Sequence, residues 1–176
     1  MTSDIILTTV GIGLGVAASH RIGYHLGAGE GRLARRAAGI PFIVSALIAS
    51  VEAAVLLPSR HVLGYIFTQD TAIVELTARL VPIVALYQFL DISNGGASGV
   101  LRGAGKNHLA GLSNCVGFYA IGLPCAYWLC FSLNLGLFGL WLGIATGSLA
   151  LLALQSGCII MLRWDWLATQ VAHSYA

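Results

Sequence analysis

One acidic residue, Asp91, lies near the middle of an apolar stretch that is long enough to cross a bilayer. Residues 80–101 carry this one formal charge, and as a helix, at about 1.5 Å per residue, they would span roughly 30 Å. A carboxylate at that depth costs from about 2.5 to more than about 10 kcal/mol, so it should face protein or a water-filled cavity rather than lipid. We therefore expect Asp91 to be a membrane-embedded site for a cation or a proton.

Polar side chains accompany this carboxylate on the predicted helix. Tyr87, Asn94 and Ser98 stand four residues before, three after and seven after it, so they share one stripe of the helix surface with Asp91. Gln88 is a further polar neighbour in the sequence. We expect these four side chains to hydrate or orient the carboxyl group. The alternative is that Asp91 is satisfied inside a helix bundle and has no role beyond packing.

The composition places the chain in the class of polytopic membrane proteins. Hydrophobic residues make up 57%, charged residues make up 9%, and the mean hydropathy is +0.84. A soluble domain has about 25% charged residues and could not keep so apolar a surface in water. The net charge of +2 is small and forms no dense basic patch, so nucleic acid is not expected as a partner.

The cysteines and the possible nucleophiles suggest neither a metal site nor an enzyme. All four cysteines lie in apolar runs without CxxC or histidine-rich spacing, and they are predicted to be small core side chains: Cys115, Cys125, Cys130 and Cys158. No nucleophile stands at a workable spacing from a base. We expect no cofactor and no metal.

Apolar runs predict an all-α integral membrane fold with five spans. A span needs about 20 residues, and the first run is shorter than this. A short interfacial helix is expected at about 70–79, with Asp70 or Thr71 as its N-cap, and a cytosolic tail at 163–176. The predicted spans are 4–18, 37–57, 80–101, 109–131 and 135–162.

Three residues inside or at the ends of the spans carry further expectations. Pro58 is predicted to close the second span, and Pro124 to kink the fourth. Glu52 lies a few residues from the predicted outer end of the second span. We expect its carboxylate to snorkel to the headgroup level, with a place on a transport path as the alternative.

Glycines recur every fourth residue in two of the spans. This small-xxx-small spacing lets two membrane helices approach closely. We expect helix packing at two ladders, which are Gly95, Gly99 and Gly103 in the third span and Gly139, Gly143 and Gly147 in the fifth.

The basic residues predict the orientation of the spans. In the five-span arrangement only Arg60 and Arg79 fall on one side. The positive-inside rule makes the opposite side cytosolic, and the C-terminus lies there as well. The basic residues on that side are Arg21, Arg32, Arg35, Arg36, Arg102, Lys106 and Arg163.

Several segments, in this order, resemble the multidrug and toxic compound extrusion (MATE) transporters, and the pattern is most similar to their eukaryotic, fungal-like branch. No single segment is diagnostic, but their order and spacing are together specific. Two departures are Gly11, where relatives usually have proline, and Tyr24, where they have asparagine. The similar segments are AASHRIGYHLGAG (17–29), DISNGGASGVLRGAGK (91–106), NCVGFYAIGLP (114–124) and GLWLG (139–143).

The resemblance implies a particular place for this chain in a larger fold. The family has twelve helices in two six-helix lobes around a central cavity. By resemblance, this chain covers the eighth helix in part and the ninth to the twelfth, so the N-terminal lobe and the seventh helix would be missing. A truncated product is therefore expected as one possibility.

The resemblance also implies an activity, which is the export of organic cations or other xenobiotics driven by inward movement of H⁺ or Na⁺. Asp91 aligns with the acidic position of the second-lobe cavity. Since a proton and a cation each neutralise a carboxylate, binding of one excludes the other, and this exclusion is antiport. We expect a multi-pass protein of the plasma or vacuolar membrane. The alternative is a non-transporting membrane fragment that needs a partner lobe.

Overall fold

A computed structural model of the chain describes residues 2–66 and 69–174 as a bundle of helices. No strand occurs within these two ranges. The all-α prediction is thus confirmed. The helices are α1 (Thr2–Gly27), α2 (Gly31–Ala37), α3 (Ile40–Leu63), α4 (Thr71–Gly103), α5 (Asn107–Asn114), α6 (Leu123–Tyr127), α7 (Leu137–Met161) and α8 (Trp164–Ser174).

Four helical stretches in the described part of the chain are long and apolar enough to cross a membrane. The predicted first span, residues 4–18, lies within α1, which is not among these four. Side chains up to residue 8 fall outside what the structure describes. The four stretches are Gly31–Val62, Thr71–Gly103, Asn107–Ser132 and Leu137–Met161.

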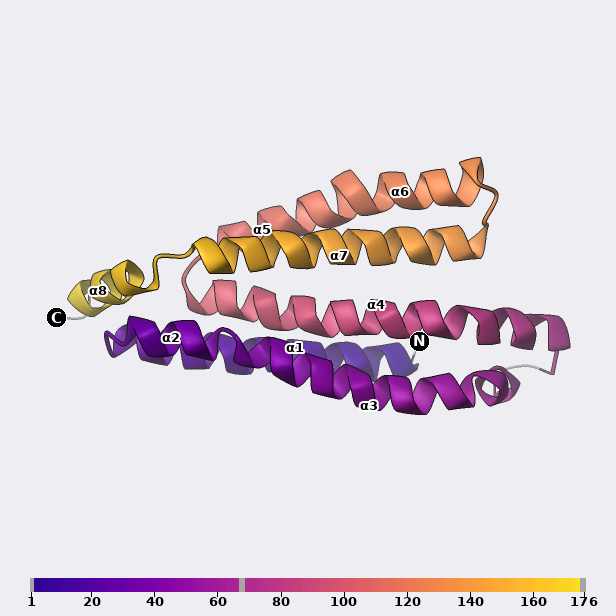
Figure 1. Ribbon diagram of the computed structural model, residues 1–176, viewed down its shortest axis with the longest axis horizontal. Helices are drawn as coiled ribbons and strands as arrows, with labels where there is room; N and C mark the ends of the chain where they lie inside the picture. The colour runs from indigo at the N-terminus through magenta and orange to yellow at the C-terminus, as the bar shows by residue number, and fades with distance from the viewer. Residues whose placement is uncertain (1, 67–68, 175–176) are drawn as a thin grey trace.

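Helix α4 is the centre of the bundle (Figure 1). It contacts α1 and α3 on one side and α7 on the other. The fourth span contacts α7 along its length, and its first part, α5, also reaches α4. The short helices α2 and α8 contact each other at one end of the bundle. Helix α4 is therefore in contact with other helices on both of these sides.

The predicted interfacial helix at 70–79 is not a separate element. It is the first part of α4, which continues without a break through Arg79. The Arg79 side chain pairs with Glu75 one turn earlier at 2.6 Å on an exposed surface, so its charge does not end the helix. The predicted cap is confirmed at Asp70, whose side chain accepts a hydrogen bond from the Ala72 N–H at 2.9 Å.

Helix α1 also continues beyond its predicted end, through the family-like loop motif, and stops at a glycine with positive φ. Gly29 has φ +75°, the N–H of Glu30 donates to the oxygen of His25 at 2.8 Å, and the Gly29 N–H donates to Leu26. This pair of bonds is the Schellman arrangement that ends a helix. The motif LGAG is therefore a helix stop.

Helix α4 ends in the same way at the second family-like motif. Gly105 has φ +69°, the Lys106 N–H donates to the Leu101 oxygen at 2.8 Å, and the Gly105 N–H donates to Arg102. Side chains with a Cβ rarely adopt this left-handed conformation, so glycine favours the turn. Both motifs contain the segment GAG, and in both this segment ends a helix.

The glycines of α4 face the backbone of α1. A Cβ on Gly95 would lie 2.7 Å from the oxygen of Gly11, one on Gly103 would lie 2.6 Å from the oxygen of Ser19, and one on Gly99 would overlap Gly15. The two helices run parallel in this seam, since the partner number rises with the glycine number. Small residues thus occur on both sides of the contact.

The α7 glycines face the fourth span. A Cβ on Gly139 would lie 2.6 Å from the Leu129 carbonyl carbon, and one on Gly147 would lie 2.8 Å from the Cα of Gly122. A Cβ on Gly143 would overlap Ala126. Close approach of these two helices leaves no room for side chains between them.

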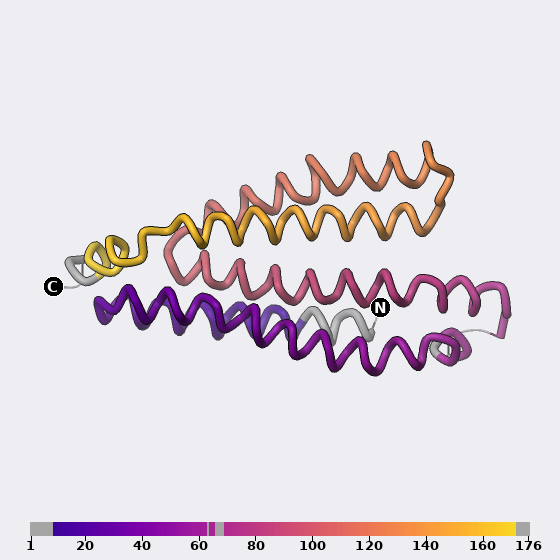
Figure 2. Tube along the Cα trace, in the orientation of Figure 1, coloured from indigo at the N-terminus to yellow at the C-terminus, as the bar shows by residue number. Residues whose placement is uncertain are grey.

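The fourth span changes its helical form around Pro124. Residues Cys115–Gly122 and Trp128–Ser132 are π-helical, and the Leu123 N–H donates to Phe118 five residues back. A proline ring clashes with the carbonyl four residues earlier in an α-helix, and a wider turn relieves that clash. In Figure 2 the trace bends away from α4 between α5 and α6.

One other prediction about a helix end is wrong. Helix α3 passes through Pro58 and ends only at Leu63. The tail at 163–176 contains α8, whose Trp164, Leu167 and Ala168 are at most 6% exposed. These three residues lie at i, i+3 and i+4, so they form one apolar face that packs against α1 and α2.

Candidate intramembrane site

The polar stripe of α4 opens onto a cleft of about 190 Å³ between α1, α4, α7 and the fourth span. Asp91 is half-buried there. Polar side chains reach the cleft from three of these elements, while α1 contributes backbone and an apolar side chain. The lining residues are Gly11, Ile12, Asp91, Asn94, Gly95, Ser98, Asn114, Phe118, Leu151 and Gln155.

The structure brings three of the five predicted site residues together. Asp91, Asn94 and Ser98 line the same cleft, as their spacing on the helix requires. Tyr87 does not line it; its ring stands edge-on to Trp141 of α7, with the ring centroids 5.8 Å apart. Tyr87 instead helps to hold α4 against α7.

Gln88 is also turned away from the cleft. It is 4% exposed, and its Oε1 has no hydrogen-bond partner among the described residues. Gln88 stands three residues before Asp91, and residues at this spacing can share a helix surface. The other α4 residues that line the cleft all stand after Asp91, so the cleft extends along α4 away from Gln88.

Asn94 links α4 to α7 through a buried hydrogen bond. Its Nδ2 donates to the backbone oxygen of Ser148 at 3.1 Å. Its Oδ1 is buried without a partner among the described residues. The bond fixes the rotation of the two helices relative to each other, and thereby the direction in which the cleft side of α4 faces.

Two cleft residues were missed by the sequence reasoning about the site. Asn114 comes from the end of α5, where its Nδ2 donates to the Ala110 oxygen at 3.0 Å. Gln155 comes from α7 and is 0% exposed. The sequence feature that pointed to Asp91 could also have pointed to Asn114 and Gln155, because each of the three is a polar residue within a long apolar run. Nothing in the sequence showed that the three runs meet.

Glu52 is the second acidic side chain at membrane depth, and the prediction that it snorkels is wrong. Helix α3 ends at Leu63 rather than near Pro58, so Glu52 lies near the middle of that helix. Both carboxylate oxygens are buried and lack a hydrogen-bond partner within the described residues. It does not line the cleft that contains Asp91.

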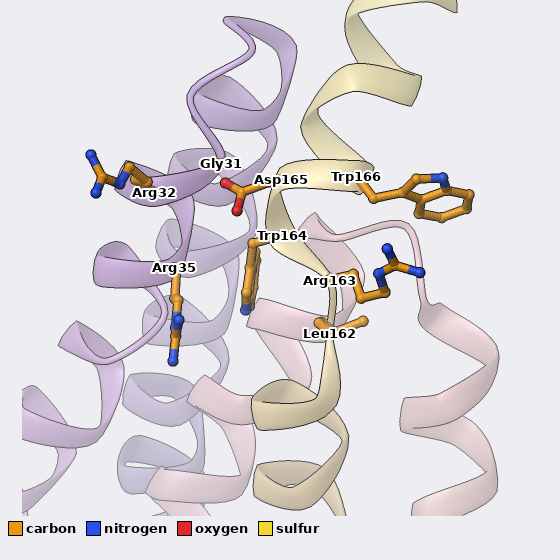
Figure 3. A pocket seen from close by; sticks show the side chains of 8 residues that line it. All are labelled: Gly31, Arg32, Arg35, Leu162, Arg163, Trp164, Asp165 and Trp166. Atoms are coloured by element: carbon orange, nitrogen blue, oxygen red, sulfur yellow. The ribbon is translucent and has the colours of Figure 1, made fainter.

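A second hollow of about 380 Å³ lies where α2 meets α8, and Figure 3 shows its lining. Arg32 and Arg163 extend to opposite sides, and Arg35 points along the bundle, so the three guanidinium groups do not converge. Trp164 reaches inward and is 5% exposed. Trp166, by contrast, is 46% exposed.

Among the residues that the structure describes, no three His, Cys, Asp or Glu side chains gather as a metal site would require. Asp91 is the one ionisable group among the ten that line the cleft. The cleft therefore offers one carboxylate surrounded by amides and a hydroxyl. Such a set can exchange a proton or bind a monovalent cation.

Comparison with known proteins identifies the same family from the sequence. The family model described as MatE matches residues 1–128. The chain is 36% identical to an uncharacterized transporter of Schizosaccharomyces pombe over 94% of its length, and 37% identical to the human multidrug and toxin extrusion protein 1 over 91%. It spans 31% of the former and 28% of the latter, which is less than a third of either relative.

Solved structures show the same fold. The crystal structure of the eukaryotic MATE transporter AtDTX14 superposes with a TM-score of 0.87 at 29% identity, covering 97% of this chain and 38% of that one. An inward-facing multidrug resistance MATE family transporter gives a TM-score of 0.80 at 20% identity, covering 89% of this chain and 36% of that one. The second likeness concerns the fold alone.

Proposed function

Because this chain belongs to the MatE family, we propose that it forms part of an antiporter that exports organic cations in exchange for H⁺, with Asp91 as the membrane-embedded exchange site. Its named relatives include multidrug and toxin extrusion proteins, which are multi-pass transporters rather than enzymes. One observation carries the proposal. The cleft between four helical segments contains a single ionisable side chain, and this side chain is Asp91.

Exchange follows from the chemistry of one carboxylate. When it is ionised it attracts a cation, and when it is protonated it does not, so cation and proton occupy the site in turn. Asn94 and Ser98 supply hydrogen-bonding groups beside the carboxylate. Na⁺ is the alternative coupling ion, since carboxylate, amide and hydroxyl oxygens also suit a hard cation.

The helix contacts around the cleft suit the movement that transport requires. Glycine seams join α4 to α1 and α7 to the fourth span, so helices can slide without side chains interlocking between them. The π-helical turns around Pro124 provide a second place where the helix can change its path. Alternating access needs such joints beside the binding site.

The test is Asp91→Asn in a chimera in which this chain replaces the matching third of its S. pombe relative. An amide keeps the size of the side chain but can neither attract a cation by charge nor release a proton. We expect efflux of a fluorescent organic cation, driven by a pH gradient in liposomes, to be lost while the expression level is unchanged.

Asp70→Asn is the matched control, because it is the same substitution and asparagine also caps a helix. We expect it to transport as the parent chimera does. Repeating the assay with a Na⁺ gradient distinguishes the two coupling ions. Retained pH-driven efflux in the Asp91→Asn chimera would remove Asp91 from the mechanism.

A further inference from the structure

Gln155 is the most deeply buried polar side chain of the cleft. It is 0% exposed, and neither its Oε1 nor its Nε2 has a hydrogen-bond partner among the described residues. It stands in α7, which contains no charged residue. Buried amides are nearly always hydrogen-bonded, because leaving one unpaired costs about 1–3 kcal/mol. A partner that is not a side chain of the described residues should therefore complete its hydrogen bonds.

Other unpaired polar atoms lie along the same contact between α4 and α7. Ser148 stands two helical turns before Gln155 on the same face of α7, and its Oγ is buried without a partner in the described structure. The Oδ1 of Asn94, which is bonded to the Ser148 backbone through Nδ2, is also unpaired. Together these atoms distribute hydrogen-bond donors and acceptors along the contact between α4 and α7.

The cleft has room for water at this place. Its volume is about 190 Å³, and a water molecule occupies about 30 Å³ of liquid. A buried water needs two to four polar partners, which the amide of Gln155 and the neighbouring side chains provide. The contacts Asn94–Ser148 and Tyr87–Trp141 put Gln155 level with Leu101, so Gln155 lies roughly 15 Å along the helices from Asp91, which lines the same cleft. A row of several water molecules, for which the cleft has room, can join the two groups by hydrogen bonds.

We propose that Gln155 is a positioning residue for Asp91: the Gln155 side-chain amide holds one end of a row of ordered water molecules in the cleft, and the other end of the row hydrogen-bonds to the Asp91 carboxylate. The water stabilises the charged form of the carboxylate and gives the proton a path to and from it. The role of this water in exchange rests on the proposed function of Asp91. The presence of the water does not, because it follows from the unpaired amide.

Asp91 is the one ionisable residue among those that line the cleft, so a change of pH within the cleft acts on its carboxyl group. Gln155 itself carries no charge at any pH. Among the side chains that the structure describes, the titratable groups on the surrounding helices that do not line the cleft are His20, Arg21, Tyr24 and His25 on α1, Glu75, Arg79, Tyr87 and Arg102 on α4, His108 on α5, Cys115, Tyr119, Cys125, Tyr127 and Cys130 on the rest of the fourth span, and Cys158 on α7.

The first experiment detects the water without relying on transport. In water-edited solid-state NMR of the 176-residue chain in lipid bilayers, magnetisation should pass from water to the Gln155 side-chain amide and to the Asp91 carboxyl carbon. In Gln155→Leu, the transfer to Asp91 should fall by at least half. Thr146→Val is the matched control, because the Thr146 Oγ1 bonds only to its own helix at Leu142; this variant should leave the transfer unchanged.

Gln155→Leu should fold, since replacing an unpaired buried amide by an apolar group of similar size is nearly neutral or stabilising. No transfer to Gln155 in the wild-type chain would overturn the proposal. So would equal transfer to Asp91 in the wild-type chain and in Gln155→Leu. Either result would leave the proposed function of Asp91 standing.

The second experiment tests the consequence for exchange in the chimera. Without the water the carboxylate loses a stabilising hydrogen bond, so it needs a higher pH to release its proton. We expect the pH of half-maximal efflux to rise by about one unit in Gln155→Leu and to stay unchanged in Thr146→Val. An unchanged midpoint in Gln155→Leu would overturn the role of Gln155, whereas loss of pH dependence in the parent chimera would count against the proposed function.

Discussion

At the residue scale, the two acidic side chains at membrane depth have different surroundings. Asp91 lines a polar cleft, whereas Glu52 has both oxygens buried and no hydrogen-bond partner in the described part of the chain. Removing a carboxylate from water without pairing it is costly, and the cost is greatest for the ionised form. Glu52 therefore lowers the stability of the fold rather than raising it.

Glu52→Gln should increase stability, because it replaces this carboxyl by a neutral group of the same size. We expect a gain of about 1 kcal/mol or more at pH 8, measured by thermal unfolding of the chain in detergent. Glu75→Gln is the control. Its carboxylate belongs to an exposed ion pair with Arg79, and it should change stability by less than about 1 kcal/mol. A clear loss of stability in Glu52→Gln would indicate a partner for Glu52 outside the described residues.

At the element scale, the packing of α4 on α1 depends on the absence of side chains at the seam. Their backbones approach so closely that a Cβ on Gly99 would overlap Gly15. Membrane helices gain no hydrophobic driving force from burying apolar groups against one another, so close van der Waals contact must hold them together. A single methyl group added between the two helices therefore weakens their contact as a whole.

Gly99→Ala should destabilise the bundle by about 2 kcal/mol or more, because the helices must separate to admit the methyl group. The measurement is the midpoint of unfolding in detergent, followed by circular dichroism. Gly13→Ala on α1 is the matched control, since a Cβ there would meet nothing within 4 Å. Alanine favours a helix by up to about 1 kcal/mol over glycine, so this variant should be neutral or more stable. Equal shifts of the unfolding midpoint in Gly99→Ala and Gly13→Ala would contradict the close contact between α4 and α1.

At the scale of the whole molecule, α2 and α8 place the C-terminal residues at one end of the bundle. They contact each other beside the hollow that Arg32, Arg35 and Arg163 line. The positive-inside rule predicts that this end is cytosolic. The helix pairing adds that α8 must lie on the same side of the membrane as α2.

This topology can be tested by labelling single cysteines with a membrane-impermeant thiol reagent in intact cells. In a chain whose four cysteines are replaced by serine, Arg60→Cys should react from outside. Arg36→Cys and Gln170→Cys should react only after the membrane is permeabilised. Reaction of Arg36→Cys in intact cells would reverse the orientation, and different behaviour of Arg36→Cys and Gln170→Cys would contradict the pairing of α2 with α8.

The sequence by itself determined the class of protein and the family, and it predicted the depth of Asp91 in the membrane. A composition with few charges and long apolar runs excludes a soluble domain, and a helix has a fixed rise per residue. Local chemistry also determined the N-cap at Asp70 and the shared stripe of Asp91, Asn94 and Ser98, since these depend only on neighbours along one helix. Each of these features can be read without knowing which helices meet.

Only the tertiary structure decided which residues from other helices join Asp91. Gln155 and Asn114 line its cleft, Gln88 does not, and α8 returns to pack on α2. A membrane helix is largely apolar both where it faces lipid and where it packs on other helices, so its sequence pattern does not reveal its partners as the pattern of an amphipathic helix in water would. Rotation and pairing are instead determined by close contacts such as the glycine seams, and these exist only once the helices have assembled.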